Sequence, residues 1–154
     1  DTTNKYVRHG EHDITEEGLR NSSARLMPRK SILLSTRAPI GYIAIADCDL
    51  CTNQGFKSII PNKGIGSEFI YYLVQSPIPY VKTLGVGSTF SEVSKSSFAS
   101  VRIILPPTTV IDRFNEIATS IGESRCVCEV RVEESIKQRD TLLPLLMNGQ
   151  VSVG

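Results

Sequence analysis

The feature that most constrains this chain is a long helical pattern in its C-terminal third. From Thr109 to Leu143 the 154-residue sequence contains no proline. Apolar residues recur there in steps of three, four or seven, at Ile111, Phe114, Ile117, Ala118, Ile121, Cys128, Val132 and Ile136. This spacing places them on one stripe of a helix, and a helix of about 33 residues is roughly 50 Å long. Such a helix overhangs a small domain, so something must cover its stripe.

The sequence also predicts where this helix begins and ends and what could pack against its apolar stripe. Thr109 to Asp112 resembles a capping box with aspartate in the last position, and Pro144 is expected to bend or end the helix before Asn148 and Gly149. Gly122 and its polar neighbours make the stripe imperfect. Two alternatives remain for what packs against the stripe. Another helix, from a second chain or from a longer chain, could pair with the stripe as a coiled coil, or the helix could fold back on its own domain.

The preceding part of the chain alternates short apolar runs with turns. β-branched residues bounded by turn residues predict four strands, at residues 32–35, 40–46, 56–60 and 101–105. We expect a helix at 68–75, capped by Ser67 and with Phe69, Tyr72 and Leu73 on its apolar face, and a helical turn at 92–97 capped by Ser91. The predicted fold class is α+β. A small β-rich domain spans 1–107, the long helix spans 108–147, and a tail spans 148–154.

Charge is unevenly distributed although the net charge is only +1. Between Arg20 and Lys63 there are seven basic and two acidic residues, an excess of five positive charges. From Arg102 onward there are six basic and seven acidic residues. A basic segment beside a neutral remainder suits contact with phosphates, although a solvated surface has the same composition.

Few patterns point to chemistry. Cys48 and Cys51 have zinc-site spacing, but no second pair follows, and Cys126 and Cys128 lie two apart in the helical pattern and face different sides. We therefore expect reduced thiols and no metal site. The polar stretch that holds His9, His12 and Asp13 reads as an exposed loop. Asp47 and Asp49 follow a predicted strand and form either an acid pair or, more commonly, a turn.

Two further motifs bear on catalytic function. The glycines and hydroxyls of Gly85–Thr89 could bind an anion, or form a plain turn, but they complete neither a P-loop nor a dinucleotide fingerprint. Ser76–Tyr80 lacks the Asn/Asp-Pro-Pro string of amino-methyltransferases and reads as a turn between helices. With no nucleophile or acid–base constellation, we predict that the chain is not an enzyme.

Several strings together resemble the target-recognition domain of type I restriction–modification DNA specificity subunits, followed by their conserved spacer helix. The strings are Ile14–Ala24, Leu34–Ile45, Thr52–Phe56, Gly87–Phe90, Leu105–Pro107 and Leu142–Gly149. In this order they cover nearly the whole chain. The abrupt polar start at Asp1–Lys5 suggests that about the first third of the recognition domain is missing.

The resemblance implies a cytoplasmic complex in which different subunits recognise, methylate and cut DNA. Specificity subunits carry two recognition domains, each reading one half of a split DNA site, and their two long helices pair antiparallel. Methyltransferase subunits dock on the helices and methylate adenines with S-adenosylmethionine, and a restriction subunit cuts DNA with ATP and Mg²⁺. This chain would then need no cofactor of its own. It would pair with a second half of a specificity subunit, or with its own copy as a homodimer reading a symmetric site.

The expected site residues follow from residue type. Phosphate contacts are expected from Arg25, Lys30, Arg37, Lys57 and Lys95, and base contacts from groups such as Arg20, Ser88 and Thr89. Strings shared across the family are expected to be scaffold, which applies to Arg37 and to Asn53–Gln54, and the unmatched stretch 4–13 offers Lys5, Arg8 and His9 as base readers. The predicted helix-pairing residues are Ile111, Phe114, Ile117, Ile121, Cys128, Val132 and Ile136. The alternatives are a coiled-coil scaffold protein that does not read DNA and a small enzyme that uses the Gly85 loop.

Overall fold

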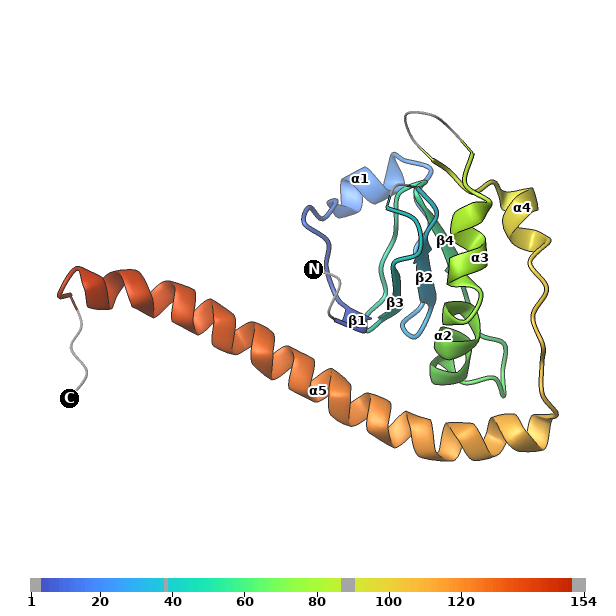
Figure 1. The fold of residues 1–154 in the computed structure, drawn as a ribbon. Helices are drawn as coiled ribbons and strands as arrows, with labels where there is room; N and C mark the ends of the chain where they lie inside the picture. Colours follow the sequence, from blue (N-terminus) through green and yellow to red (C-terminus); the bar gives the residue numbers. More distant parts are fainter. Residues whose placement is uncertain (1–3, 38, 87–90, 151–154) are drawn as a thin grey trace. The chain divides into compact units, whose positions relative to one another are not determined.

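The structure is a computed structural model that describes residues 4–37, 39–86 and 91–150 (Figure 1). The chain divides into two compact units, residues 1–119 and 120–154. The first unit holds a four-stranded sheet, four short helices and the first turns of the long helix. The second holds the rest of that helix. No helix among the described residues is both long enough and apolar enough to cross a lipid bilayer.

The sheet has the order β1-β3-β2-β4 and is mixed. β1 (Tyr6–Val7) runs parallel to β3 (Ile43–Ala46), whereas β2 (Ile32–Ser35) is antiparallel to both β3 and β4 (Phe56–Ile59). All four residues of β2 are buried, because this strand lies inside the sheet and is covered on both faces. The core is therefore centred on β2 and β3.

Three of the four predicted strands are confirmed. β3 is shorter than the predicted 40–46 because Gly41 adopts a left-handed φ of +98° in the turn that joins β2 to β3. In that turn Gly41 N–H donates to the Ser35 carbonyl at 3.0 Å, and Tyr42 N–H donates to Ser35 Oγ at 2.9 Å. β1, which is too short to produce an alternating pattern, was not predicted.

The predicted strand at 101–105 is wrong. In the described structure this segment belongs to no strand, although its composition favours one. Ile103, Ile104 and Leu105 are exposed, Ile104 at 91%. β propensity by itself does not make a strand, since a strand also needs a neighbour to complete its hydrogen bonds.

The short helices differ from prediction mainly at their ends. They are α1 (Glu16–Arg20), α2 (Ser67–Gln75), α3 (Ile78–Thr83) and α4 (Lys95–Ala99). α2 is capped by the backbone of Gly66 and not by Ser67. α4 replaces the expected turn at 92–97, and Ser94 rather than Ser91 caps it by accepting from Ser97 N–H.

α3 and α1 were not predicted as helices. Pro77 precedes α3 and Pro79 lies in its first turn, where a missing N–H costs nothing. The prolines that suggested a turn therefore begin a helix. α1 is capped by the Thr15 side chain, which accepts from Gly18 N–H at 3.1 Å.

The long helix α5 (Thr108–Met147) is continuous over 40 residues, which confirms the principal prediction. It begins at Thr108, so Thr109 lies inside its first turn and is not the cap. Pro144 does not end the helix. The helix ends at Met147, and Gly149, with φ +68°, follows in the left-handed conformation, where Gln150 N–H donates to the Leu145 carbonyl at 2.9 Å.

The first turns of α5 are anchored in the core of the first unit. Ile111 is 2% exposed, and the Phe114 ring makes edge-on contacts with Phe69 (5.8 Å between centroids) and Tyr72 (5.9 Å) of α2. Gly66 permits the close approach, because a Cβ there would lie 2.3 Å from Asn115 Oδ1. Ile111 is therefore not available for helix pairing, and its assignment to that interface is corrected, whereas Phe114 is half-buried and its assignment stays a prediction.

Candidate nucleic-acid interface

The sheet topology brings three charged residues from distant parts of the sequence to one edge. Arg8 follows the C-terminal end of β1, and Asp47 follows the C-terminal end of β3, its parallel neighbour. Arg29 precedes β2, which is antiparallel to β3, so the start of β2 lies at the same edge. We call these three residues the Arg8–Asp47–Arg29 cluster.

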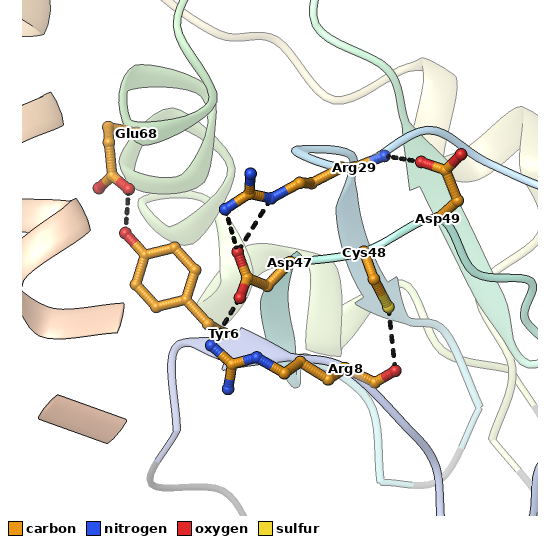
Figure 2. Close-up of polar contacts among 7 residues, drawn as sticks. All are labelled: Tyr6, Arg8, Arg29, Asp47, Cys48, Asp49 and Glu68. Atoms are coloured by element: carbon orange, nitrogen blue, oxygen red, sulfur yellow. Dashed lines mark hydrogen bonds and ion pairs between the residues drawn. The ribbon is translucent and has the colours of Figure 1, made fainter. Parts of the chain in front are cut away.

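Asp47 accepts hydrogen bonds from both arginines of the cluster, as Figure 2 shows. Its Oδ2 accepts from Arg8 Nη2 at 2.5 Å, and its Oδ1 accepts from Arg29 Nε at 3.1 Å and Arg29 Nη2 at 2.7 Å. The Asp47 side chain is 9% exposed, whereas that of Arg29 is 57% exposed. The carboxylate is thus shielded and at least one guanidinium faces solvent, with a net charge of +1 for the cluster.

Backbone contacts fix the segments that carry these side chains. Asp47 N–H donates to the Val7 carbonyl at 2.9 Å, and Cys48 Sγ donates to the Arg8 carbonyl at 3.1 Å. Asp49 Oδ1 accepts from Arg29 N–H at 2.7 Å (Figure 2). Asp47 and Asp49 therefore serve as turn and ion-pair residues, which favours the turn interpretation of this motif over an acid–base pair.

Lys30, beside the cluster, has an unusual backbone. Its φ is +75°, the left-handed region that a residue with a side chain enters only at a cost. Its N–H donates to the Ala46 carbonyl at 2.7 Å, and its Nζ lies 6.0 Å from the centre of the Tyr6 ring. The side chain is half-buried, so Lys30 adds a second positive charge next to Arg29.

Lys5, predicted to contact DNA, is instead part of the core. It is 2% exposed and forms an ion pair with Glu68 of α2, which also accepts a hydrogen bond from the Tyr6 hydroxyl (Figure 2). Lys5 Nζ also lies over the Tyr71 ring at 4.5 Å and the Tyr72 ring at 4.3 Å. A lysine enclosed in this way cannot reach a phosphate, so Lys5 is removed from the predicted DNA contacts.

Arg37 contacts Glu92, which lies 55 residues further along the chain. It forms a β-bridge with Glu92, and its Nε donates to Glu92 Oε2 at 3.0 Å. Val86 and Glu92 exchange two backbone hydrogen bonds of 3.2 Å at the base of the segment that contains Ser88 and Thr89. Ser88, Thr89 and most of the predicted anion loop lie outside the described residues.

The remaining predicted DNA contacts are spread over several elements. Arg20 is exposed at the end of α1 and pairs with Glu16 at 3.3 Å. Arg25 and Lys95 are exposed, and Lys57 on β4 is half-buried. His9 is exposed, with Nδ1 3.2 Å from the Gly10 carbonyl. Asn53 Oδ1 accepts from Gly55 N–H at 2.9 Å, the contact of a turn residue.

Arg29 is not among the DNA contacts predicted from the sequence. A basic residue in a turn before a strand carries no signal by itself. The pair Asp47 and Asp49 could have indicated Arg29, because an aspartate that is shielded from solvent beside a basic segment needs a positively charged partner.

Beyond its first turns α5 presents apolar side chains to solvent. Ile117 is 66% exposed, and Ile121, Cys128, Val132 and Ile136 of the predicted stripe are also exposed. Arg131, Val132, Ser135, Ile136 and Arg139 line a shallow groove. Four of these residues stand at positions i, i+3, i+4 and i+7, the arrangement that receives one side chain of a partner helix in a coiled coil. Cys126 is buried while Cys128 is exposed, as their spacing predicted.

Comparisons with known proteins agree on one family. Residues 1–113 match the family model described as the type I restriction modification DNA specificity domain. The type I restriction enzyme MjaIX specificity subunit of Methanocaldococcus jannaschii is 46% identical over 103 residues, 66% of this chain and 24% of that protein. The HindI specificity subunit of Haemophilus influenzae is 29% identical over 149 residues, 95% of this chain and 32% of that protein.

A solved structure supports the fold. The crystal structure of the type I restriction-modification S subunit from M. genitalium has a TM-score of 0.56 at 17% identity, covering 93% of this chain and 36% of that one. The chain spans about a quarter to a third of the length of the curated relatives that it matches.

Proposed function

Because this chain belongs to the type I restriction–modification DNA specificity family, we propose that it recognises one half of a bipartite site in duplex DNA. The observation that carries the proposal is the family match over residues 1–113, which contain the whole sheet and the Arg8–Asp47–Arg29 cluster. Basic residues at one sheet edge supply the charge that phosphate contact needs. The proposed interface comprises Arg8, Arg20, Arg25, Lys30, Arg37, Lys57, Lys95 and, outside the described residues, Ser88 and Thr89.

In this proposal the chain has no catalytic role. Methyl transfer, with S-adenosylmethionine, would belong to methyltransferase subunits, and cleavage, with ATP and Mg²⁺, to the restriction subunit. The assembly would work in the cytoplasm. Methyl transfer by this chain alone with S-adenosylmethionine would contradict the assignment.

The experiment is selection of duplex DNA from a random pool, with the methyltransferase subunit present and salt near physiological. The expected result is enrichment of a split site with an adenine in each half. A symmetric site would indicate a dimer of this chain, and an asymmetric one a second half of different sequence. Binding that fades uniformly as salt rises, with no enriched site, would contradict specific recognition.

The exposed stripe of α5 supports a second part of the proposal, pairing with another helix. Val132 lies in the groove and is 57% exposed, so aspartate there would put a charge into the paired interface. The matched control is Val127→Asp, because Val127 is similarly exposed (51%) but lies off the stripe. We expect sedimentation to show that Val132→Asp loses the paired form and Val127→Asp keeps it. If both keep it, the stripe is not the interface.

The stripe also favours one competing function, a coiled-coil scaffold that does not read DNA. The selection experiment separates the two. A chain that pairs in sedimentation but shows no binding to any duplex, at low or high salt, is a scaffold.

A further inference from the structure

The backbone of Arg29 is held more firmly than that of an ordinary surface arginine. It lies in the turn between Pro28 and Ser31, where Ser31 N–H and Oγ donate to the Pro28 carbonyl at 3.2 and 2.7 Å. Met27 and Leu50 exchange two backbone hydrogen bonds, of 2.8 and 3.1 Å, just before this turn. Together with the Asp49 contact, these bonds fix the point from which the side chain leaves the domain.

The Arg29 side chain is oriented as well as anchored. Nε and Nη2 both donate to Asp47 Oδ1, which directs this edge of the guanidinium toward the carboxylate. Asp47 cannot turn to follow it, because Oδ2 is bound by Arg8 and the carboxylate is 9% exposed. This contact uses Nε and Nη2, and the side chain is 57% exposed to solvent.

An oriented arginine side chain matters less for a contact with a DNA phosphate than for a contact with a base. A phosphate can be bound by a mobile lysine, which acts as a point charge and needs no fixed plane. A guanine presents O6 and N7 side by side in the major groove, and an arginine binds both only when its planar donors lie in the plane of the base. Orientation before binding removes an entropy cost that a mobile side chain would have.

We propose that Arg29 reads a guanine and that Asp47 is the positioning residue that orients it. This inference rests on the proposed function and deepens it. Arg8 holds Asp47 in place from the other side and keeps the cluster positive. The geometry thus assigns the edge formed by the ends of β1 and β3 and the start of β2 to the major groove.

The test repeats the selection with two variants, Arg29→Lys and Asp47→Asn, each checked for folding by thermal unfolding. Lysine keeps the charge but not the planar donors. We expect Arg29→Lys to relax the preference for guanine at one position by about 5- to 150-fold, the range of a good bidentate contact. Its affinity for random duplex, and the salt dependence of that affinity, should stay unchanged.

Asp47→Asn should relax the same position although it removes no DNA contact. Its affinity for random duplex should not fall, because a negative charge is lost, and a purely structural role would not produce this combination. Arg125→Lys is the matched control, because Arg125 is an exposed arginine paired with Glu129 that lies outside the proposed interface and should leave this position unaltered.

Three outcomes would overturn the inference. If the wild type enriches a site and Arg29→Lys enriches the same site equally, Arg29 does not read a base, while the proposed function stands. If Arg29→Lys weakens all sequences alike, Arg29 is a phosphate contact. If the wild type enriches no site, the proposed function fails and the inference fails with it.

Discussion

Replacing Lys30 with glycine separates what the backbone of this residue requires from what its charge contributes. The left-handed φ of +75° costs a lysine about 1 kcal/mol or somewhat more. Glycine avoids that cost, but it raises the entropy of the unfolded chain and thereby lowers the free energy of unfolding by about 0.5–1 kcal/mol. The lysine contact with the Tyr6 ring, at 6.0 Å, adds at most about 0.5 kcal/mol. We therefore expect Lys30→Gly to change the free energy of unfolding by less than about 1 kcal/mol, or no more than about 5 °C in Tm.

The same substitution should weaken DNA binding in a salt-dependent way. Loss of one phosphate contact makes the plot of log affinity against log salt shallower by about 0.9. Between 50 and 200 mM salt the variant should thus lose about three- to fourfold less affinity than the wild type. Thermal unfolding measures the first effect and a salt titration with random duplex measures the second.

Two further variants complete the design at this position. Lys30→Ala removes the charge but keeps the backbone cost, and Lys30→Arg keeps both. If Lys30→Gly lowers stability by several kcal/mol, the Lys30 side chain stabilises the fold far more than its contact with the Tyr6 ring allows, and the reasoning is refuted. If Lys30→Gly and Lys30→Arg give the same salt slope, Lys30 does not contact phosphate.

The remaining predictions concern the core and the surface. Glu68→Leu should destabilise the first unit by about 3–5 kcal/mol, because it leaves Lys5 buried without its carboxylate, and Lys5→Met added to it should recover much of the loss in chemical unfolding. Equal stability of the single and double variants would exclude a coupled pair. Ile111→Ala should lower the free energy of unfolding by about 2–5 kcal/mol, whereas Ile117→Ala should change it by less than about 0.5 kcal/mol, since only the first is buried. Similar losses would mean that α5 is anchored elsewhere. Glu92→Gln should alter Tm little, since its pair with Arg37 is exposed, and a loss above about 2 kcal/mol would contradict that.

The elements with a clear period were predictable from the sequence, and those fixed by distant partners were not. The stripe of α5 and the apolar runs of β2, β3 and β4 each repeat long enough to reveal their type. β1 is two residues long and exists because β3 hydrogen-bonds to it. The 101–105 segment has the composition of a strand, yet composition cannot tell whether a neighbour is present.

The candidate site was predictable in charge but not in geometry. Residue types indicated a basic segment, but they could not show that Lys5 pairs with Glu68, which lies 63 residues away. Nor could they show that Asp47 lies between two arginines, because that depends on the register of β1 against β3. Sequence spacing therefore found the region, and only the strand pairing could identify the residues.

The position of the Arg8–Asp47–Arg29 cluster has a consequence for how such proteins can diverge. All three residues lie just beyond the hydrogen-bonded strands, whereas the side chains that fold the domain, Ile32, Leu34 and Ile45, lie within them. Substitutions at the strand ends can alter the charge and shape offered to a ligand without leaving a cavity in the interior. Selection can therefore act on what is recognised and on whether the chain folds as two nearly independent traits.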